Sequence, residues 1–419
     1  MAKIKQVTAR EILNSKGIPT VETTIVLSDN TISTGSAPGR TSIGGSEAAE
    51  LIDNDPNRFN GCGTLKAVDA VINQIGPKLI GMDVDKQREI DKILIDMDGT
   101  QNKSHLGTNS TLSVSIAVAK AGAKSSVLPL FLYLRQFINN EHLNLKIPTP
   151  CFNILNGGKI ADKNLDFQSF LLIPASSKTY SESLQIGTNI YRLLRENLEL
   201  KNLPTLVGDE GGFGPNLSSN EEGLSIIKQT VDDTALRLGF DVFFGIDCCA
   251  NNFYSDKKYK IKDSVMQLSA SELINFYEDL NKKFHILYLE DPLQEEDWDG
   301  WMQICAKISQ NIIIVGDHLT STNPYRLQTA IDKKAITGIV IKPSQIGTVI
   351  ETLAVVEVAR QAGLKITVSS TSAETTDDFI ADFAVAVSAD YVKFGAPARG
   401  ENIAKYNRLL DIEQQFKSI

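Results

Sequence analysis

Residues 286–342 contain three short apolar runs, Ile286-Leu-Tyr-Leu-Glu290, Ile312-Ile-Ile-Val-Gly-Asp317 and Gly338-Ile-Val-Ile-Lys342, and each run ends in a charged residue. Continuous apolar runs of this length are typical of parallel strands that are buried on both faces. The charged ends lie 27 and 25 residues apart (317−290 and 342−317). This is a typical length for a repeat of one strand, one helix and the next parallel strand. The stretch therefore predicts consecutive strands of a parallel α/β sheet.

The same pattern extends to both sides of this stretch. Three further runs end in a polar residue: Val242-Phe-Phe-Gly-Ile before Asp247, Lys365-Ile-Thr-Val before Ser369 and Tyr391-Val before Lys393. Helix signals separate the runs: a capping box from Ser269 to Glu272, an Asn323-Pro324 start, and Gly363 after a helix over 349–362. We expect a parallel α/β barrel, whose polar strand ends meet at the mouth, where active sites lie.

The first 138 residues follow a different pattern. A strand-like run covers residues 21–27, and a Gly/Ser/Thr-rich loop at 34–45 has the composition of a mobile lid. Helical patterns then dominate, with a closely packed buried helix expected over 109–123. A polar stretch that ends in Pro148-Thr-Pro150 marks a boundary. We therefore expect an N-terminal α+β capping domain at 1–138 and the barrel, with the active site, at 139–419.

Composition excludes several classes of protein. With 419 residues, of which 42% are hydrophobic, the chain can form two folded domains and is not disordered. The formal net charge of −9 argues against nucleic acid as a partner. No apolar run approaches a membrane span, and the start of the chain lacks the apolar stretch of a signal peptide. Five cysteines without C-x-x-C spacing fit reduced thiols, so we expect a cytoplasmic protein.

Three carboxylates end strands of the predicted barrel: Asp247, Glu290 and Asp317. Facing one another at the mouth, they would repel unless a cation lay between them. Oxygen ligands of this kind suit Mg²⁺. The alternative is that polar residues simply end strands or cap helices, but three in a row after buried strands favour a magnesium site.

Lys342 ends the next strand in a wholly apolar context, where an ammonium group is costly unless it is used. Desolvation and nearby cations would lower its pKa and make it a general base; a salt bridge to one of the carboxylates is the alternative. Lys393 ends a later strand and would bind an anionic substrate or help keep Lys342 neutral. Glu210 lies in the glycine-dense loop 208–215 and is a candidate acid, although its composition also fits a turn with solvated carboxylates.

Several longer motifs lie in order along the chain. They are Ala9-Arg-Glu-Ile-Leu-Asn-Ser-Lys-Gly-Ile-Pro-Thr-Val-Glu22, Asn102-Lys-Ser-His-Leu-Gly-Thr-Asn109, Asn153-Ile-Leu-Asn-Gly-Gly158, Val207-Gly-Asp-Glu-Gly-Gly-Phe213, Leu289-Glu-Asp-Pro-Leu293, Ile341-Lys-Pro-Ser-Gln-Ile-Gly347 and Ala404-Lys-Tyr-Asn407. Together they resemble the enolase family over essentially the whole chain. The resemblance implies an α+β lid domain followed by a TIM-like eight-stranded αβ barrel whose first turns depart from the regular pattern. It also implies the glycolytic conversion of 2-phosphoglycerate to phosphoenolpyruvate and water.

The resemblance implies a role for each candidate residue. Asp247, Glu290 and Asp317 would hold one Mg²⁺, and Ser42 in the lid would help to hold a second one that arrives with the substrate. Lys342 would accept the proton from C2, and Glu210 would donate a proton to the departing C3 hydroxyl. Substrate contacts would come from Gln168, Thr371, Ser372 and Lys393. The family resemblance also implies a homodimer or higher homo-oligomer, and a fraction at the cell surface or secreted without a signal peptide.

Some positions depart from the family pattern. Ile160 replaces a histidine of the family, and Ser169 replaces the glutamate that partners the acid. Ser370 and Thr371 replace the histidine and the phosphate-gripping arginine of a later loop. His318 replaces the aspartate after the third metal ligand. The lid reads Gly39-Arg-Thr-Ser-Ile-Gly44, so Arg40, like Lys159, is a new cation that would partly replace the arginine. The proton-abstracting half is thus intact, and the half that binds phosphate and expels hydroxide is altered.

These departures leave three hypotheses. The first is enolase activity. The second is an enolase-family enzyme that acts on another phosphorylated or phosphonylated carboxylate in specialised metabolism. The third is a non-catalytic binding protein with this fold, against which the retained Lys342 and Glu210 argue.

Overall fold

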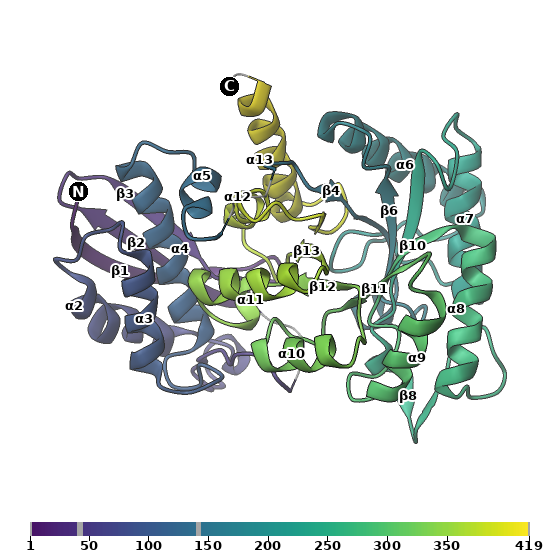
Figure 1. The fold of residues 1–419 in the computed structure, drawn as a ribbon, viewed down its shortest axis with the longest axis horizontal. Coiled ribbons are helices and arrows are strands. Elements are labelled where there is room, and N and C mark those ends of the chain that lie inside the picture. Colours follow the sequence, from purple (N-terminus) through teal and green to yellow (C-terminus); the bar gives the residue numbers. More distant parts are fainter. Residues whose placement is uncertain (1, 40–44, 140–143, 418–419) are drawn as a thin grey trace.

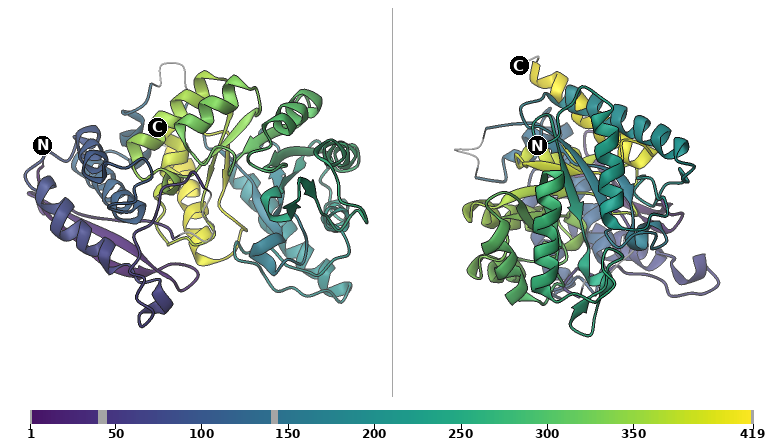
Figure 2. Two further views of the ribbon diagram at one scale, coloured as in Figure 1. Left: turned by 90° about the horizontal axis from the view of Figure 1, so that it is seen from below. Right: turned by 90° about the vertical axis from the view of Figure 1, so that its right-hand side faces the viewer.

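The computed structural model describes residues 2–39, 45–139 and 144–417. Figure 1 shows two parts: an N-terminal unit in purple and blue on the left, and a larger αβ unit in teal, green and yellow on the right. The further views in Figure 2 also place the first unit beside the second. None of the helices in the described ranges is long and apolar enough to span a membrane.

The N-terminal unit is a three-stranded antiparallel sheet with helices on one side. Strand β1 (Ile4–Leu13) pairs with β2 (Pro19–Leu27), which pairs with β3 (Ile32–Ser36). The alternating burial along β2 leaves every second side chain on the core face. The following helices are η1 (Phe59–Gly61), α1 (Leu65–Asp69), the π-helix η2 (Ala70–Ile75), α2 (Gly76–Leu79), α3 (Gln87–Asp98), α4 (Thr108–Ser125) and α5 (Leu130–Arg135).

Helix α4 joins the two units and confirms the buried helix expected over 109–123. Its Val114, Ala117 and Val118 pack in the core of the N-terminal unit, whereas Leu112 and Ile116 pack in the core of the larger unit. The small side chains of α4 allow close approach on both sides. The Cβ that a substitution would add at Gly35 of β3 would lie only 2.5 Å from the Ala117 backbone nitrogen.

The larger unit is a nearly closed αβ barrel. Its sheet has the order β4-β14-β13-β12-β11-β10-β7-β6-β5. The strands are β4 (Thr149–Pro150), β5 (Phe152–Asn156), β6 (Ser169–Pro174), β7 (Val242–Asp247), β10 (Ile286–Glu290), β11 (Ile313–Gly316), β12 (Gly338–Ile341), β13 (Lys365–Ser369) and β14 (Tyr391–Lys393). Since β4 and β5 are separated by Cys151 alone, they occupy one place in the barrel. This confirms the eight-stranded architecture.

The barrel departs from a regular one at its start, as the family resemblance implies. Strand β6 runs antiparallel to both β5 and β7, whereas β7 and the later strands run parallel. A short helix, η3 (Gly158–Ala161), is the only helix between β5 and β6 in this fully described stretch. A parallel crossover needs a longer connection, usually with a full helix.

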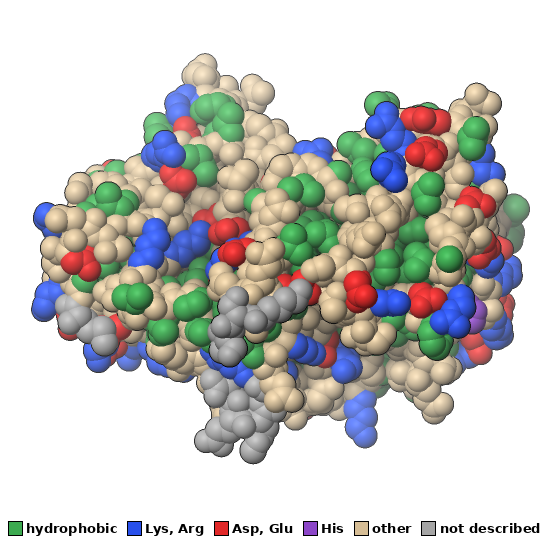
Figure 3. All heavy atoms as spheres, turned by 90° about the horizontal axis from the view of Figure 1, so that it is seen from above, with side chains coloured by type: hydrophobic (Ala, Val, Ile, Leu, Met, Phe, Trp, Pro, Cys, Tyr) green, Lys and Arg blue, Asp and Glu red, His purple; other side chains and the backbone are tan. Residues whose placement is uncertain are grey.

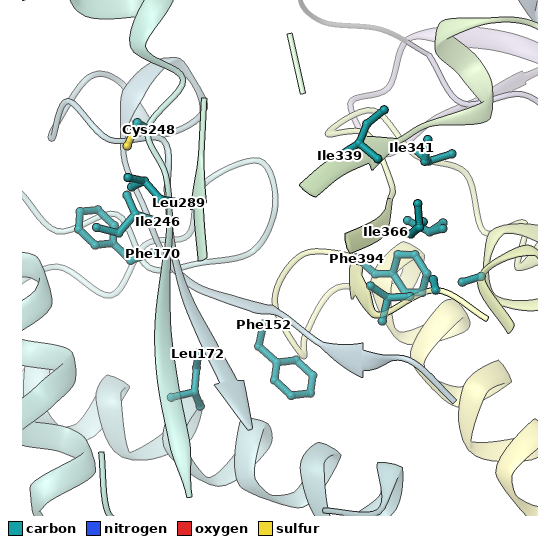
Figure 4. Packing of buried hydrophobic residues seen from close by; sticks show 14 of the residues in the cluster. Phe152, Phe170, Leu172, Ile246, Cys248, Leu289, Ile339, Ile341, Ile366 and Phe394 are labelled. Atoms are coloured by element: carbon teal, nitrogen blue, oxygen red, sulfur yellow. The ribbon is translucent and has the colours of Figure 1, made fainter. Parts of the chain in front are cut away.

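Helices cover the outside of the barrel strands. They are α6 (Tyr180–Leu200), α7 (Asn220–Asp232), α8 (Ala270–Phe284), α9 (Trp298–Ile308), α10 (Pro324–Asp332), α11 (Val349–Gln361), α12 (Phe379–Ala386) and α13 (Gly400–Lys417), with the turns η4 (Ala250–Phe253) and η5 (Pro343–Gln345) and the hairpin β8 (Tyr254–Ser255) and β9 (Lys258–Tyr259). Three predicted helix ends are confirmed. Ser269 forms the capping box before α8, and Asn323 caps α10. Gly363 follows α11 with φ 75°. Figure 4 shows part of the shared core, with Phe170, Ile246 and Leu289 in one group and Ile339, Ile341 and Ile366 in another.

Basic and acidic side chains are mixed on the face of the molecule in Figure 3, where Lys and Arg (blue) and Asp and Glu (red) are interspersed. Such a mixture is typical of solvated surface.

Candidate active site at the barrel mouth

The three predicted carboxylates meet at the mouth of the barrel. Asp247 and Glu290 are the last residues of the neighbouring parallel strands β7 and β10 and pair in register. Asp317 directly follows β11, which is the next strand of the sheet. All three are buried, with 2%, 0% and 3% exposure, so none of them is a solvated strand end.

Two lysines lie among these carboxylates. Lys393 Nζ donates hydrogen bonds to Asp247 Oδ2 at 2.9 Å and to Glu290 Oε1 at 2.5 Å. Lys342 Nζ forms an ion pair with Asp317 Oδ2. Burial would lower the pKa of Lys342, but the adjacent Asp317 carboxylate outweighs burial and raises it. The sequence predicts a lowered pKa, so this prediction is wrong.

Negative charge remains in excess within this cluster. Burial and the neighbouring Asp247 carboxylate raise the pKa of Glu290 to about 8, against the opposing effect of Lys393. The three acids also outnumber the two lysines that pair with them, so not every carboxyl group has an ammonium group of its own. Carboxylate oxygens suit a hard divalent cation such as Mg²⁺; among the described residues, the donor atoms within 4.8 Å of one another belong to Asp291, Asp317 and His318.

Asp291 is a site residue that the sequence analysis missed. Its Oδ1 accepts a hydrogen bond from the Asp317 amide at 3.0 Å, and its Oδ2 accepts one from the His318 amide at 2.8 Å. The His318 Nδ1 lies 2.7 Å from the same Oδ2. Burial lowers the pKa of His318, but the Asp291 carboxylate outweighs this and raises it to about 10. The signal was available, since Asp291 directly follows Glu290 in the sequence.

Two glutamines donate hydrogen bonds to these carboxylates. Gln168 Nε2 donates to Asp247 Oδ2 at 3.2 Å, which places this predicted substrate-contact residue beside the acidic cluster. Gln345 Nε2 donates to Asp317 Oδ1 at 3.1 Å and to Glu47 Oε1 at 3.2 Å. Gln345 thereby connects the metal-ligand candidate with Glu47, which lies just after the lid loop.

Glu210 faces the same site from the loop between α6 and α7. Asn153 Nδ2 donates to Glu210 Oε2 at 2.6 Å, and Ser169 Oγ lies 3.5 Å from this oxygen. Burial raises the pKa of Glu210, and Lys393 opposes this effect. A carboxyl group with a raised pKa is suited to donate a proton.

The remaining predicted residues border the opening. The Thr371 amide donates to Glu374 Oε1 at 3.1 Å, and its hydroxyl donates to Gly39 O at 3.1 Å. The Ser370 amide donates to Lys393 O at 3.1 Å, and Ser372 O accepts a hydrogen bond from Ser15 Oγ at 3.4 Å. Ser42 and Arg40 lie outside the described residues.

A cavity of about 310 Å³ connects these groups. Its lining includes Asp247, Asp317, Lys342, Lys393, Glu210, Gln168, Thr371, Ser372, His318, Lys159 and Ile160. Lys16 also borders the cavity, where its Nζ lies 2.5 Å from Asp209 Oδ2. The structure therefore brings together every predicted site residue that it describes except Glu290, which lies directly behind the lining beside Asp247.

Comparison with known proteins agrees with this architecture. Residues 4–134 match the family model "Enolase, N-terminal domain", and residues 144–419 match "Enolase, C-terminal TIM barrel domain". The chain is 45% identical over 416 residues to a protein named Enolase from Acidothermus cellulolyticus, and the match covers 99% of this chain and 95% of that protein. The two family models together span nearly the whole sequence, so this chain belongs to the enolase family.

Proposed function

We propose that this protein is a phosphopyruvate hydratase, a carbon–oxygen lyase that interconverts 2-phosphoglycerate and phosphoenolpyruvate in glycolysis. The observation that carries the proposal is the meeting of Lys342 and Glu210 at one cavity, with the buried acids Asp247 and Asp317 in its lining. The reaction needs a base at C2, an acid at the C3 hydroxyl, and positive charge where negative charge develops. Near full-length similarity to an enolase supports it further.

Asp247, Glu290 and Asp317 would hold the first Mg²⁺, and Ser42 would contribute to a second one. When bound, Mg²⁺ supplies positive charge that stabilises the extra negative charge on the substrate carboxylate after C2 loses its proton. The excess of buried carboxylates over ammonium groups supports this assignment.

Lys342 would accept the C2 proton at Nζ, and it can do so only as a neutral amine. Its ion pair with Asp317 opposes neutrality, so engagement of Asp317 by another cation favours the basic form. Lys393, held by Asp247 and Glu290, would bind the substrate carboxylate together with Gln168. Thr371 and Ser372 would offer hydroxyl groups to the phosphate.

Three further features follow from the sequence pattern and the family resemblance. We propose a division into domains between residues 138 and 139, a homodimer or higher homo-oligomer, and action in the cytoplasm. The departures at Ile160, Ser169 and Thr371 alter the surroundings of the substrate, but none of them favours another particular substrate or a non-catalytic role.

A coupled measurement tests the function. Purified protein with Mg²⁺ and 2-phosphoglycerate should form an enol product that is followed by ultraviolet absorbance, and a chelator should stop the reaction. The matched control is Lys342→Met, which keeps an unbranched side chain one atom shorter, has no basic amine and should lower turnover by about 10²–10⁴-fold. Absence of product from the unmodified protein, with no exchange of the C2 proton for deuterium, would refute the proposal.

A further inference from the structure

The carboxyl group of Glu210 meets two neutral polar side chains that are fully buried. Asn153 and Ser169 each have 0% exposure. Asn153 Nδ2 lies 2.6 Å from Glu210 Oε2 and Ser169 Oγ lies 3.5 Å from it, so the amide makes the stronger contact. The other oxygen, Glu210 Oε1, has no hydrogen-bond partner among residues 2–39, 45–139 and 144–417, and the residue lines the cavity.

The main chain of Glu210 is fixed independently of this contact. The Glu210 carbonyl oxygen accepts hydrogen bonds from the Ala396 amide at 2.8 Å and from Asn402 Nδ2 at 3.1 Å. Two residues later, the Gly212 amide donates to Asn156 Oδ1 at 2.9 Å. The backbone is therefore held from both sides, and the direction of the carboxyl group is left to the Asn153 amide.

Asn153 is unfavourable for stability at its position. Its Nδ2 also donates to Ser169 Oγ at 2.9 Å, but its Oδ1 is buried and has no hydrogen-bond partner in the part of the chain that the structure describes. A buried carbonyl oxygen without a partner destabilises a fold, and an apolar side chain of similar shape would remove this cost. Residues that reduce stability beside reacting groups are typical of functional sites.

We propose that Asn153 is the positioning residue for proton donation by Glu210. Its amide holds Oε2 and leaves Oε1 to carry the proton into the cavity. This inference rests on the proposed function, in which Glu210 is the acid. Ser169 completes the surroundings with a neutral hydroxyl, so no carboxylate competes with Glu210 for the proton at this contact.

The step that depends on Asn153 is the loss of the C3 hydroxyl group. The Oε1–H bond breaks, and the proton goes to the C3 hydroxyl oxygen, which leaves as water with the electron pair of the C3–O bond. The electron pair left at C2 by proton abstraction forms the C2–C3 double bond. Asn153 Nδ2 then stabilises the carboxylate that remains on Glu210. Abstraction of the C2 proton by Lys342 does not use this amide.

The experiment compares two rates in the same sample. Asn153→Leu removes the amide and keeps a branched side chain with the same number of heavy atoms. Its dehydration rate should fall by about tenfold or more, while exchange of the C2 proton with deuterated solvent, followed by NMR, should fall by less than about threefold. The ratio of exchange to dehydration should therefore rise. General damage to the site would lower both rates together and leave this ratio unchanged.

Two further variants keep the test decisive. Asn153→Ala removes the same amide and should raise the ratio as well, which covers a failure of the leucine variant to fold. Ser169→Ala is the matched control in the same hydrogen-bond network, and its ratio should stay within about twofold of the unmodified protein because Asn153 remains in place. The melting temperatures of the three variants show that each of them folds, so that a change in the ratio is read from folded protein only.

The outcomes separate this inference from the proposed function. An unmodified protein that forms product, together with an unchanged ratio in both Asn153 variants, overturns the inference alone. A shift in Ser169→Ala as large as that in Asn153→Leu also overturns it, because the hydroxyl would then be the group that matters. An unmodified protein that forms no product refutes the proposed function, and the inference with it.

Discussion

The Tyr288 side chain holds one carboxylate of the acidic cluster by a hydrogen bond. Its hydroxyl donates a hydrogen bond to Glu290 Oε2 at 2.7 Å, and it is fully buried beneath the mouth of the barrel. A donor of this kind fixes the carboxylate that the proposed Mg²⁺ site needs. Tyr288→Phe should therefore weaken Mg²⁺ binding by about 10–100-fold, as removal of partners behind metal ligands generally does.

The measurement is a Mg²⁺ titration of the dehydration rate, supported by calorimetry with Mg²⁺ alone. Tyr391→Phe is the matched control, since this ring packs against Tyr288 with centroids 6.0 Å apart. Of these two tyrosines, Tyr288 is the one that donates to Glu290 Oε2. An equal loss of affinity in both variants would show that ring packing, rather than the hydroxyl, determines the effect.

At the residue scale, the sequence predicts the groups that end strands but not their partners. Asp247, Glu290, Asp317, Lys342 and Lys393 could be found because each follows a buried apolar run. Gln345 and Asn153 were missed because their partners are far away in the chain, whereas Asp291 and Tyr288 lie within two residues of Glu290 and could have been found there. Asn153 and Glu210, for example, are 57 residues apart in the chain.

At the element scale, Asp390 joins the beginnings of three barrel strands. Its Oδ2 accepts a hydrogen bond from the Ile366 amide of β13 at 3.0 Å, and its Oδ1 accepts one from Lys146 at 3.0 Å. Its own carbonyl oxygen accepts from the Thr149 amide of β4 at 3.1 Å. Asp390 directly precedes β14, so its carboxylate links β14 to β13, and its backbone carbonyl links β14 to β4, at the end of the barrel away from the site.

Asp390→Asn should lower the free energy of unfolding by about 1–3 kcal/mol at neutral pH. Burial opposes ionisation of Asp390, but the Ile366 amide and Lys146 outweigh it and hold its pKa below the usual 3.8. Because the folded pKa is the lower one, this stabilisation is present above pH 3.8 and is lost as pH falls through the folded value. The difference from the unmodified protein should therefore shrink in acid.

Denaturant unfolding at a series of pH values checks this. Asp232→Asn is the control, because its pair with Lys228 is exposed on α7 and should contribute at most about 0.5 kcal/mol. A difference for Asp390→Asn that persists unchanged below the folded pKa would contradict the electrostatic explanation.

The elements themselves were largely predictable, and their directions were not. The strands that end at Asp247, Glu290, Asp317, Lys342 and Lys393 lie where the apolar runs predict them. The residue pattern alone does not reveal that β6 runs against its neighbours, because burial on both faces looks the same in either direction. The family resemblance implies only that the first turns of the barrel depart from the regular pattern.

At the scale of the whole molecule, α4 belongs to both hydrophobic cores. We therefore expect the two units to unfold together in one transition. Both tryptophans, Trp298 and Trp301, lie on α9 of the barrel, so their fluorescence reports on the barrel, whereas far-ultraviolet circular dichroism reports on the whole chain. The two signals should change at the same denaturant concentration; a separate early transition in circular dichroism would show that the N-terminal unit unfolds alone.

The surplus of negative charge at the mouth makes stability depend on both Mg²⁺ and pH. The pKa of Glu290 is raised to about 8. The pKa of Glu290 is higher in the folded state than in the unfolded state, so the folded state holds the proton more tightly. The stability that this proton contributes is fully present below about pH 4.3 and is lost as pH rises toward 8. With a chelator present, the melting temperature should therefore fall over this range. Mg²⁺ at 100 times its dissociation constant should restore about 2.7 kcal/mol.

Glu290→Gln distinguishes the effect of the carboxylate charge from the effect of side-chain shape, because it keeps the shape and removes the surplus carboxylate. With a chelator at pH 8, the variant should be at least as stable as the unmodified protein, since no buried carboxyl remains to be ionised there. It should also lose most of the rise in melting temperature on adding Mg²⁺. Thermal melts of both proteins, with and without Mg²⁺ across this pH range, decide the matter. An equal rise in melting temperature on adding Mg²⁺ to the two proteins would show that the ion binds elsewhere. Gathering carboxylates at one site lowers the stability of the fold, and binding of the cation at that site should restore it.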